Sequence, residues 1–194
     1  MPQISRQEFE RLPLRVHAFL AGVPLHDVWA VDLPRLRPGV TLDEFVHAAG
    51  ALPFRPSSVV RTLLNIRLLV GRLLGWDADP GVIVRETFAT RLTAGDRAQS
   101  LAAAGTREGR FRLVYRFENE QLLELNNRTA HAAALSALVE TATGYRFYFA
   151  VYVRRVHRLT PVYMAVIDPF RKLIVYPSLL GSVRMAWNRT FGTA

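Results

Sequence analysis

Apolar and polar residues alternate along much of the second half of the chain, which is the pattern of half-buried β-strands. Four segments are expected to be strands: 110–117, 121–125, 129–141 and 144–157. Glu118-Asn119 and Asn126-Asn127 separate the first three segments and favour tight turns, because asparagine tolerates a positive φ. Strands joined by such short turns predict an antiparallel meander.

The first third of the chain predicts helices and one further strand. Ser5 and Thr41 each begin a sequence typical of a capping box, so a short helix is expected after each of them. Residues 25–33 are mostly apolar and end before a proline, which predicts a strand. Ser57 is a good N-cap for a third helix that should continue to about Gly75.

Two later regions complete the expected order of elements. Residues 82–92 are rich in Val, Ile, Thr and Phe and predict a strand, whereas the polar, alanine-rich segment 93–109 has no clear pattern. Thr160, followed by a proline, is a good start for a long C-terminal helix. Pro169 and Pro177 should kink or break that helix.

Helices and antiparallel strands are segregated along the chain, which indicates an α+β fold. The order fits a helix-grip (START-like) arrangement, in which a curved antiparallel sheet is wrapped around a long, proline-kinked C-terminal helix. Such a sheet leaves a cavity beside the helix. The length of 194 residues fits one domain. We expect an N-terminal helical extension over residues 1–24 and a single helix-grip domain over residues 25–194.

Composition excludes several kinds of chemistry. The chain has no cysteine, so it has no disulfide scaffold, thiol nucleophile, cysteine-ligated zinc or iron–sulfur cluster. The net charge is +9, but the basic residues are scattered and no nucleic-acid-binding motif accompanies them. All but one of the 25 basic residues are arginine, which is typical of a GC-rich, bacterial coding genome. Nucleic acid is therefore not an expected partner.

No stretch of the sequence is typical of export or membrane insertion. The first eight residues lack the apolar run of a signal peptide. The most apolar stretch, 63–76, is too short and too charged to span a bilayer. We therefore expect a cytoplasmic protein without a membrane span, and the sequence leaves its oligomeric state open, a homo-oligomer included.

Several stretches resemble an uncharacterised domain family of the START-like (SRPBCC) helix-grip superfamily. They are Tyr163–Val175, Leu122–Ala134, Phe147–His157, and Ile66-Arg67-Leu68 followed by Leu74-Gly75-Trp76. Members of this family are sometimes fused to NAD-dependent epimerase-like domains. The resemblance covers about residues 25–185 and implies a START-like fold with an apolar cavity, but no reaction. Arg171 and Thr129 stand where the family tends to have histidine.

The histidines do not form a metal-binding pattern. No two of the five are spaced i, i+4, and none accompanies a carboxylate in a ligand motif. The chain also has no glycine-rich phosphate loop and no nucleophile elbow. We therefore expect no metal site and no cofactor.

Arg67 is the candidate anchor for an acidic ligand. On a helical wheel of the third predicted helix it falls within the apolar arc. A guanidinium there could bind a ligand carboxylate bidentately. It could also form an internal ion pair with Glu124 or Glu86, or extend past its stem to water.

Four further polar residues are candidates on the predicted sheet. His131 and Glu124 flank the second asparagine turn and are weak catalytic candidates, either as an acid/base pair in the cavity or as a polar pair on a solvent face. Tyr148 and Tyr152 share one face of the last strand and could offer hydroxyls to a ligand. They could equally form an outer tyrosine–arginine surface.

The expected function is binding of a small or medium-sized apolar molecule, acidic if Arg67 is its anchor. Tyr163, Ile167 and Phe170 belong to a helical segment that is apolar almost all round, so they should line the cavity. The alternative is an enzyme on the same scaffold, a cyclase, isomerase or hydrolase of secondary-metabolite type that uses Arg, His, Glu or Tyr groups of the cavity. A structural partner of a nucleotide-binding redox protein is implied only by the family's fusions.

Overall fold

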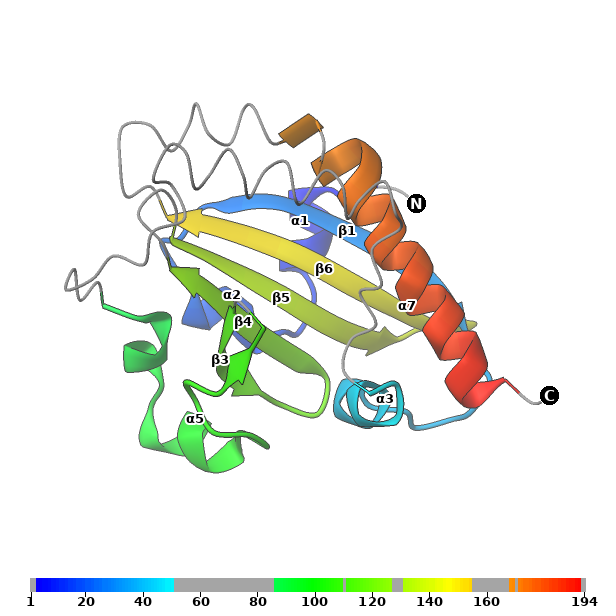
Figure 1. Ribbon diagram of the computed structural model, residues 1–194, viewed down its shortest axis with the longest axis horizontal. Helices are drawn as coiled ribbons and strands as arrows, with labels where there is room; N and C mark the ends of the chain where they lie inside the picture. Colours follow the sequence, from blue (N-terminus) through cyan, green and yellow to red (C-terminus); the bar gives the residue numbers. More distant parts are fainter. Residues whose placement is uncertain are drawn as a thin grey trace.

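A six-stranded antiparallel sheet forms the centre of the protein, with the strand order β1-β6-β5-β4-β3-β2 (Figure 1). The computed structural model describes residues 3–50, 86–109, 111–126, 131–154, 168–169 and 171–192. The strands are β1 (Leu25–Pro34), β2 (Arg107–Glu108), β3 (Phe111–Arg116), β4 (Glu120–Asn126), β5 (His131–Glu140) and β6 (Gly144–Arg154). The predicted meander and the predicted strand near residue 25 are therefore confirmed.

Helices lie on both sides of this sheet, so the fold class α+β is confirmed. They are α1 (Arg6–Glu10), α2 (Arg15–Phe19), α3 (Leu42–Ala48), the 3₁₀ helix η1 (Phe88–Arg91), α5 (Ala94–Gln99), the π-helical turn η2 (Arg171–Val175) and α7 (Tyr176–Phe191). Ser5 and Thr41 cap α1 and α3 as expected, because each hydroxyl accepts a hydrogen bond from the backbone N–H three residues on. The predicted helix 57–75 lies outside the described residues.

One face of the sheet packs against α7 and α3, and we call it the α7 face (Figure 1). Trp29 and Val31 of β1 and Phe147 of β6 contribute to this core. Phe45 of α3 and Trp187 of α7 meet there with ring centroids 5.3 Å apart. The alternation along β1 and β6 thus supplies an apolar surface for the C-terminal helix.

The opposite face is covered by α1, α2 and η1, and we call it the N-terminal face. Phe9 and Val16 from the two helices and Leu135 from β5 are fully buried there. The first residues of the chain thus share a core with the sheet. The division into residues 1–24 and 25–194 stays a prediction.

The predicted strand 82–92 is wrong over the part of it that the structure describes. Phe88–Arg91 is a 3₁₀ helix, and the Thr87 hydroxyl caps it by accepting from the N–H of Ala89. This part of the chain turns into a helix because Thr87 and Phe88 give their hydrogen bonds to the Glu124 side chain, not to a neighbouring strand. The untyped segment 93–109 contains α5 and β2.

Of the predicted C-terminal helical segment, the structure describes residues 168–169 and 171–192. The π-helical turn η2 lies between Pro169 and Pro177, and the second proline occupies the first turn of α7, where its missing N–H leaves no bond unmade. The kinks expected at these prolines stay predictions. Among the helices that the structure describes, none is long and apolar enough to cross a membrane.

Candidate functional site

A β-bulge near the start of β1 directs two consecutive polar residues toward the C-terminal helix. The register of β1 against β6 shifts between Leu25 and Asp27, so His26 is the extra residue. A bulge bends its strand and changes the direction of the side chain at the extra position. As a result, Asp27 contacts Tyr176 of α7 while His26 contacts Asp168, immediately ahead of η2.

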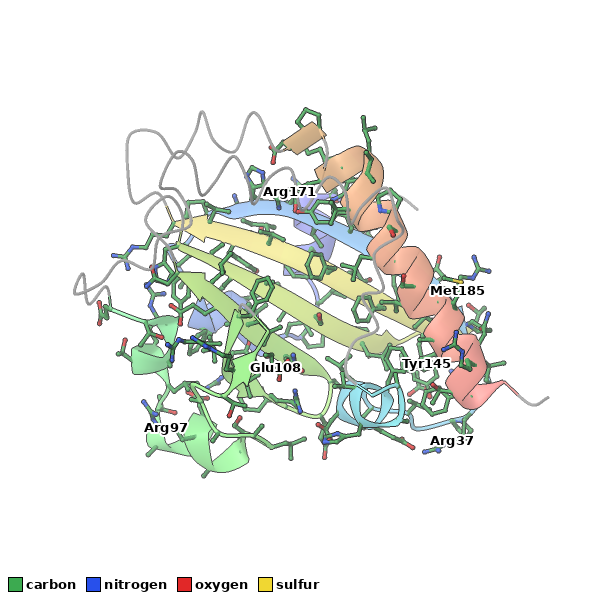
Figure 2. All side chains as sticks on the ribbon, in the orientation of Figure 1. Arg37, Arg97, Glu108, Tyr145, Arg171 and Met185 are labelled. Carbon is green, nitrogen blue, oxygen red and sulfur yellow. The ribbon has the colours of Figure 1, made fainter. Side chains whose placement is uncertain are left out.

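Five polar side chains meet at this point, and we call them the polar cluster: His26, Asp27, Asp168, Arg171 and Tyr176. The Nε2 atom of His26 lies 2.9 Å from both carboxylate oxygens of Asp168. Arg171 donates from Nη1 to Asp168 at 3.0 Å, and its Nη2 lies 3.5 Å from Asp27. The Tyr176 hydroxyl contacts Arg171 and donates to Asp27 at 3.1 Å. Figure 2 shows Arg171 beside the start of α7.

Burial differs within the polar cluster and sets its electrostatics. Asp27 is 4% exposed, whereas the side chains of His26 and Asp168 are 25% and 20% exposed. Burial raises the pKa of Asp27, as does the nearby charge of Asp168, although Arg171, His26 and the hydrogen bond from Tyr176 act in the opposite direction. Burial also raises the pKa of Tyr176, so its phenol stays protonated and serves as a donor.

Within the polar cluster, the positive charge of Arg171 is balanced by carboxylates. The cluster contains two carboxyl groups and one guanidinium, and its imidazole is charged only when protonated. Arg171 touches both carboxylates and is therefore already paired. An anionic ligand brought here would find no unpaired positive charge within the cluster.

Three members of the polar cluster have a spacing that could hold a cation. Ligand atoms of His26, Asp27 and Asp168 all lie within 4.8 Å of one another. An imidazole with two carboxylates is a donor set suited to Mn²⁺, Fe²⁺ or Zn²⁺. The guanidinium of Arg171 already supplies a positive charge to both carboxylates, so an ion would have to compete with it. The expected absence of a metal site stays a prediction.

Part of the α7 face keeps accessible surface beside the polar cluster. Five residues that share this face are only partly buried, and we call them the half-open patch: Leu123, Leu125, Ala132, Ala134 and Phe149. The ring centroid of Phe149 lies 5.7 Å from that of Tyr176, which joins the patch to the polar cluster. On the N-terminal face, by contrast, Ala133 and Leu135 are 0% exposed. The two faces of the same strands are therefore filled to different extents.

The predicted pair His131 and Glu124 is in contact, but it is buried. His131 Nε2 lies 2.5 Å from Glu124 Oε1, and the two side chains are 1% and 3% exposed. The Thr87 hydroxyl and the Phe88 N–H also donate to this carboxylate. The Phe88 ring stacks on His131 with centroids 4.0 Å apart. The interpretation as a polar pair on a solvent face is thus wrong, because η1 covers both residues.

These contacts fix η1 to the sheet. Burial alone would raise the pKa of Glu124, but the hydrogen bonds from His131, Thr87 and Phe88 outweigh it, so the pKa is lowered. An ionised carboxylate with several donors is a stable buried arrangement. A role for His131 and Glu124 in acid/base catalysis stays a prediction.

The tyrosines predicted to line the cavity lie on the N-terminal face, away from α7. Tyr148 and Tyr152 are 4% and 5% exposed and belong to the core beneath α1 and α2. The ring centroid of Tyr148 lies 6.1 Å from that of Phe9. They form no outer surface, and their role as ligand contacts stays a prediction. Arg67, Tyr163, Ile167 and Phe170 lie outside the described residues.

A pocket of about 410 Å³ lies beside α5, lined by Leu92, Arg97, Ser100, Leu101, Ala102, Ala103 and Ala104. Figure 2 shows Arg97 at the opposite side of the molecule from Arg171. This pocket is therefore separate from the polar cluster and the half-open patch.

Sequence reasoning missed the polar cluster, because its members come from distant parts of the chain. His26 and Asp168 are 142 positions apart. One local signal was present: Asp27 shares a strand face with the apolar residues Trp29, Val31 and Leu33. A charged residue on the buried face of a strand needs a partner, so it marks a site where the fold brings one.

Comparison with known proteins places the chain in a family. Residues 19–178 match a family described as "Protein of unknown function (DUF2867)". No curated protein and no solved structure matches the chain. The matched range includes all five residues of the polar cluster. Because the match covers most of its length, the chain belongs to this uncharacterised domain family.

Proposed function

We propose that the protein binds a small or medium-sized apolar molecule on the α7 face, between the sheet and the C-terminal helix. The observation that carries the proposal is the half-open patch with the polar cluster at one end. Binding sites for small molecules are mostly apolar and contain a few convergent polar groups. The helix-grip (START-like) arrangement, and a lining formed by Tyr163, Ile167 and Phe170, belong to this proposal.

The difference between the two sheet faces supports a site on the α7 face. Ala132 and Ala134 point to this face, and their small side chains leave room above β5. Ala133, which lies between them, is completely buried by the elements of the N-terminal face. Protein interiors are normally close-packed, so the partial exposure of Ala132 and Ala134 beside a completely buried Ala133 is a feature that a ligand would explain.

Adjacent alanines on opposite faces allow a matched test. Ala134→Leu should fill the space on the α7 face and abolish binding of a neutral apolar probe, N-phenyl-1-naphthylamine, while the melting temperature changes little. Ala133→Leu adds the same volume to the filled face and should cost about 1–3 kcal/mol of stability by overpacking. The folded fraction of that control should still bind the probe. Equal probe fluorescence in the wild type and Ala134→Leu would refute the site.

Enzymatic activity on the same scaffold is the second candidate, favoured by one observation. The imidazole of His26 is held by both oxygens of Asp168, and a carboxylate that orients a histidine is a common acid/base arrangement. Hydrolysis is the simplest of the cyclase, isomerase and hydrolase reactions to assay. Turnover of p-nitrophenyl butyrate that disappears in His26→Gln, at an unchanged melting temperature, would support this candidate over binding alone.

A further inference from the structure

The indole N–H of Trp29 is a buried donor that lacks an acceptor. Trp29 is 8% exposed and lies on the α7 face, yet its Nε1 atom has no hydrogen-bond partner among the described residues. Trp187 shows the usual arrangement, since its Nε1 donates to the carbonyl oxygen of Pro34 at 3.0 Å. A buried donor without a partner is costly, so natural proteins rarely leave one unless water or a ligand completes it.

This donor lies beside the polar cluster. The ring centroids of Trp29 and Tyr176 are 5.3 Å apart, and the Tyr176 hydroxyl bonds to Asp27. The cluster itself offers acceptors, because its two carboxylates have lone pairs beyond those that His26, Arg171 and Tyr176 occupy. The α7 face thus presents an unpaired donor and a surplus of acceptors around one group of aromatic rings.

We propose that the ligand of this site is a neutral aromatic or alicyclic alcohol, and that the site discriminates against carboxylates. A hydroxyl oxygen can accept from the Trp29 N–H, and its hydrogen can be donated to a carboxylate of the polar cluster. A ligand carboxylate could accept but not donate, and it would be a third negative charge beside Asp27 and Asp168. This inference rests on the proposed function and narrows the class of ligand. The expected ligand is a neutral alcohol, whereas Arg67 would anchor an acidic ligand.

Three probes with one ring system test the inference: 2-methylnaphthalene, 2-naphthalenemethanol and 2-naphthoate, measured by equilibrium dialysis. Trp29→Phe keeps an aromatic ring and removes only the N–H. The variant should weaken binding of the alcohol by about fivefold to tenfold, which is the effect of losing one hydrogen bond. Its affinity for the hydrocarbon should stay within about twofold of that of the wild type. Because each probe is compared with itself, differences in water solubility among the probes cancel.

A second variant tests discrimination against carboxylates, and this test does not require that Trp29→Phe folds correctly. Asp168→Asn removes one negative charge at a partly exposed position and should strengthen naphthoate binding at least fivefold while the hydrocarbon is unchanged. The inference would be overturned if Trp29→Phe weakened binding of the alcohol and the hydrocarbon equally. It would also be overturned if Asp168→Asn bound naphthoate no better than the wild type does. Neither result would contradict the proposed function. If none of the three probes binds the wild type, the proposed function fails together with the inference.

Discussion

Glu120 is a buried carboxyl group whose ionisation should make the protein less stable as the pH rises. The residue is 4% exposed, and neither of its carboxyl oxygens has a hydrogen-bond partner among the residues described. Burial raises its pKa from 4.5 to about 7. The Tyr115 hydroxyl and the backbone N–H groups of Val16 and Arg15 lie near the carboxyl without forming a hydrogen bond, and together with the charge of Arg15 they lower the pKa by less than burial raises it.

The size and the sign of the effect follow from the two pKa values. Raising the pKa from 4.5 to about 7 corresponds to about 3 kcal/mol, at about 1.36 kcal/mol for each pH unit. The folded state holds the proton more tightly than the unfolded state. The stabilisation is therefore complete below pH 4.5 and is lost as the pH rises to about 7. Above that pH the loss stays constant.

The variant Glu120→Gln cannot ionise, so it should lack this decline. We expect the free energy of unfolding of the variant, relative to the wild type, to increase by about 3 kcal/mol between pH 4.5 and pH 8. Urea titrations at five pH values measure this difference. His17, whose pKa is lowered chiefly by burial, stabilises the protein with rising pH, but it is present in both proteins and cancels. Parallel stability curves for the two proteins would refute the reasoning.

Three further predictions concern the polar cluster, the buried carboxylate of Glu124 and the cap of α5. Arg171→Leu should destabilise the protein by about 3 kcal/mol in urea unfolding, because Asp27 is left as an uncompensated buried charge, and adding Asp27→Asn should restore most of the loss. Glu124→Gln should cost about 1–3 kcal/mol at pH 7, and the cost should shrink as the pH falls through the lowered pKa of the wild-type carboxyl, where the wild type also becomes neutral. Thr93→Ala should cost about 1 kcal/mol in thermal unfolding by removing the cap of α5, whereas the exposed control Thr106→Ala should cost less.

The sheet was predictable because its signals are local. Period-2 alternation marks the strands within a few residues, asparagine turns separate the first three of them, and β3 to β6 follow these signals closely. The segment at Phe88 was mistaken for a strand because its Val- and Thr-rich composition was the only local evidence. Its conformation is decided by Glu124, which lies 36 positions later and takes the hydrogen bonds of Thr87 and Phe88. Tertiary contacts of this kind override composition.

The faces of the strands were harder to assign than the strands themselves. Alternation showed that Tyr148 and Tyr152 share a face of β6, but it could not show which layer covers that face. The answer depends on α1 and α2, whose short sequences carry little periodic signal. A strand that is buried on both sides has no polar face to fix its orientation. For this reason the alternation left open whether the two tyrosines face a ligand or another layer of the protein.

The two histidine–carboxylate pairs differ in exposure, and we propose different roles for them. Glu124 and His131 are seven positions apart, so the sequence revealed them, but Thr87 and Phe88 cover them and their side chains are only 3% and 1% exposed. His26 and Asp168 have the same chemistry and are 20–25% exposed. They also lie in the polar cluster that Tyr176 joins to the half-open patch. Loss of the first pair should therefore lower stability, whereas loss of the second should change what the protein binds.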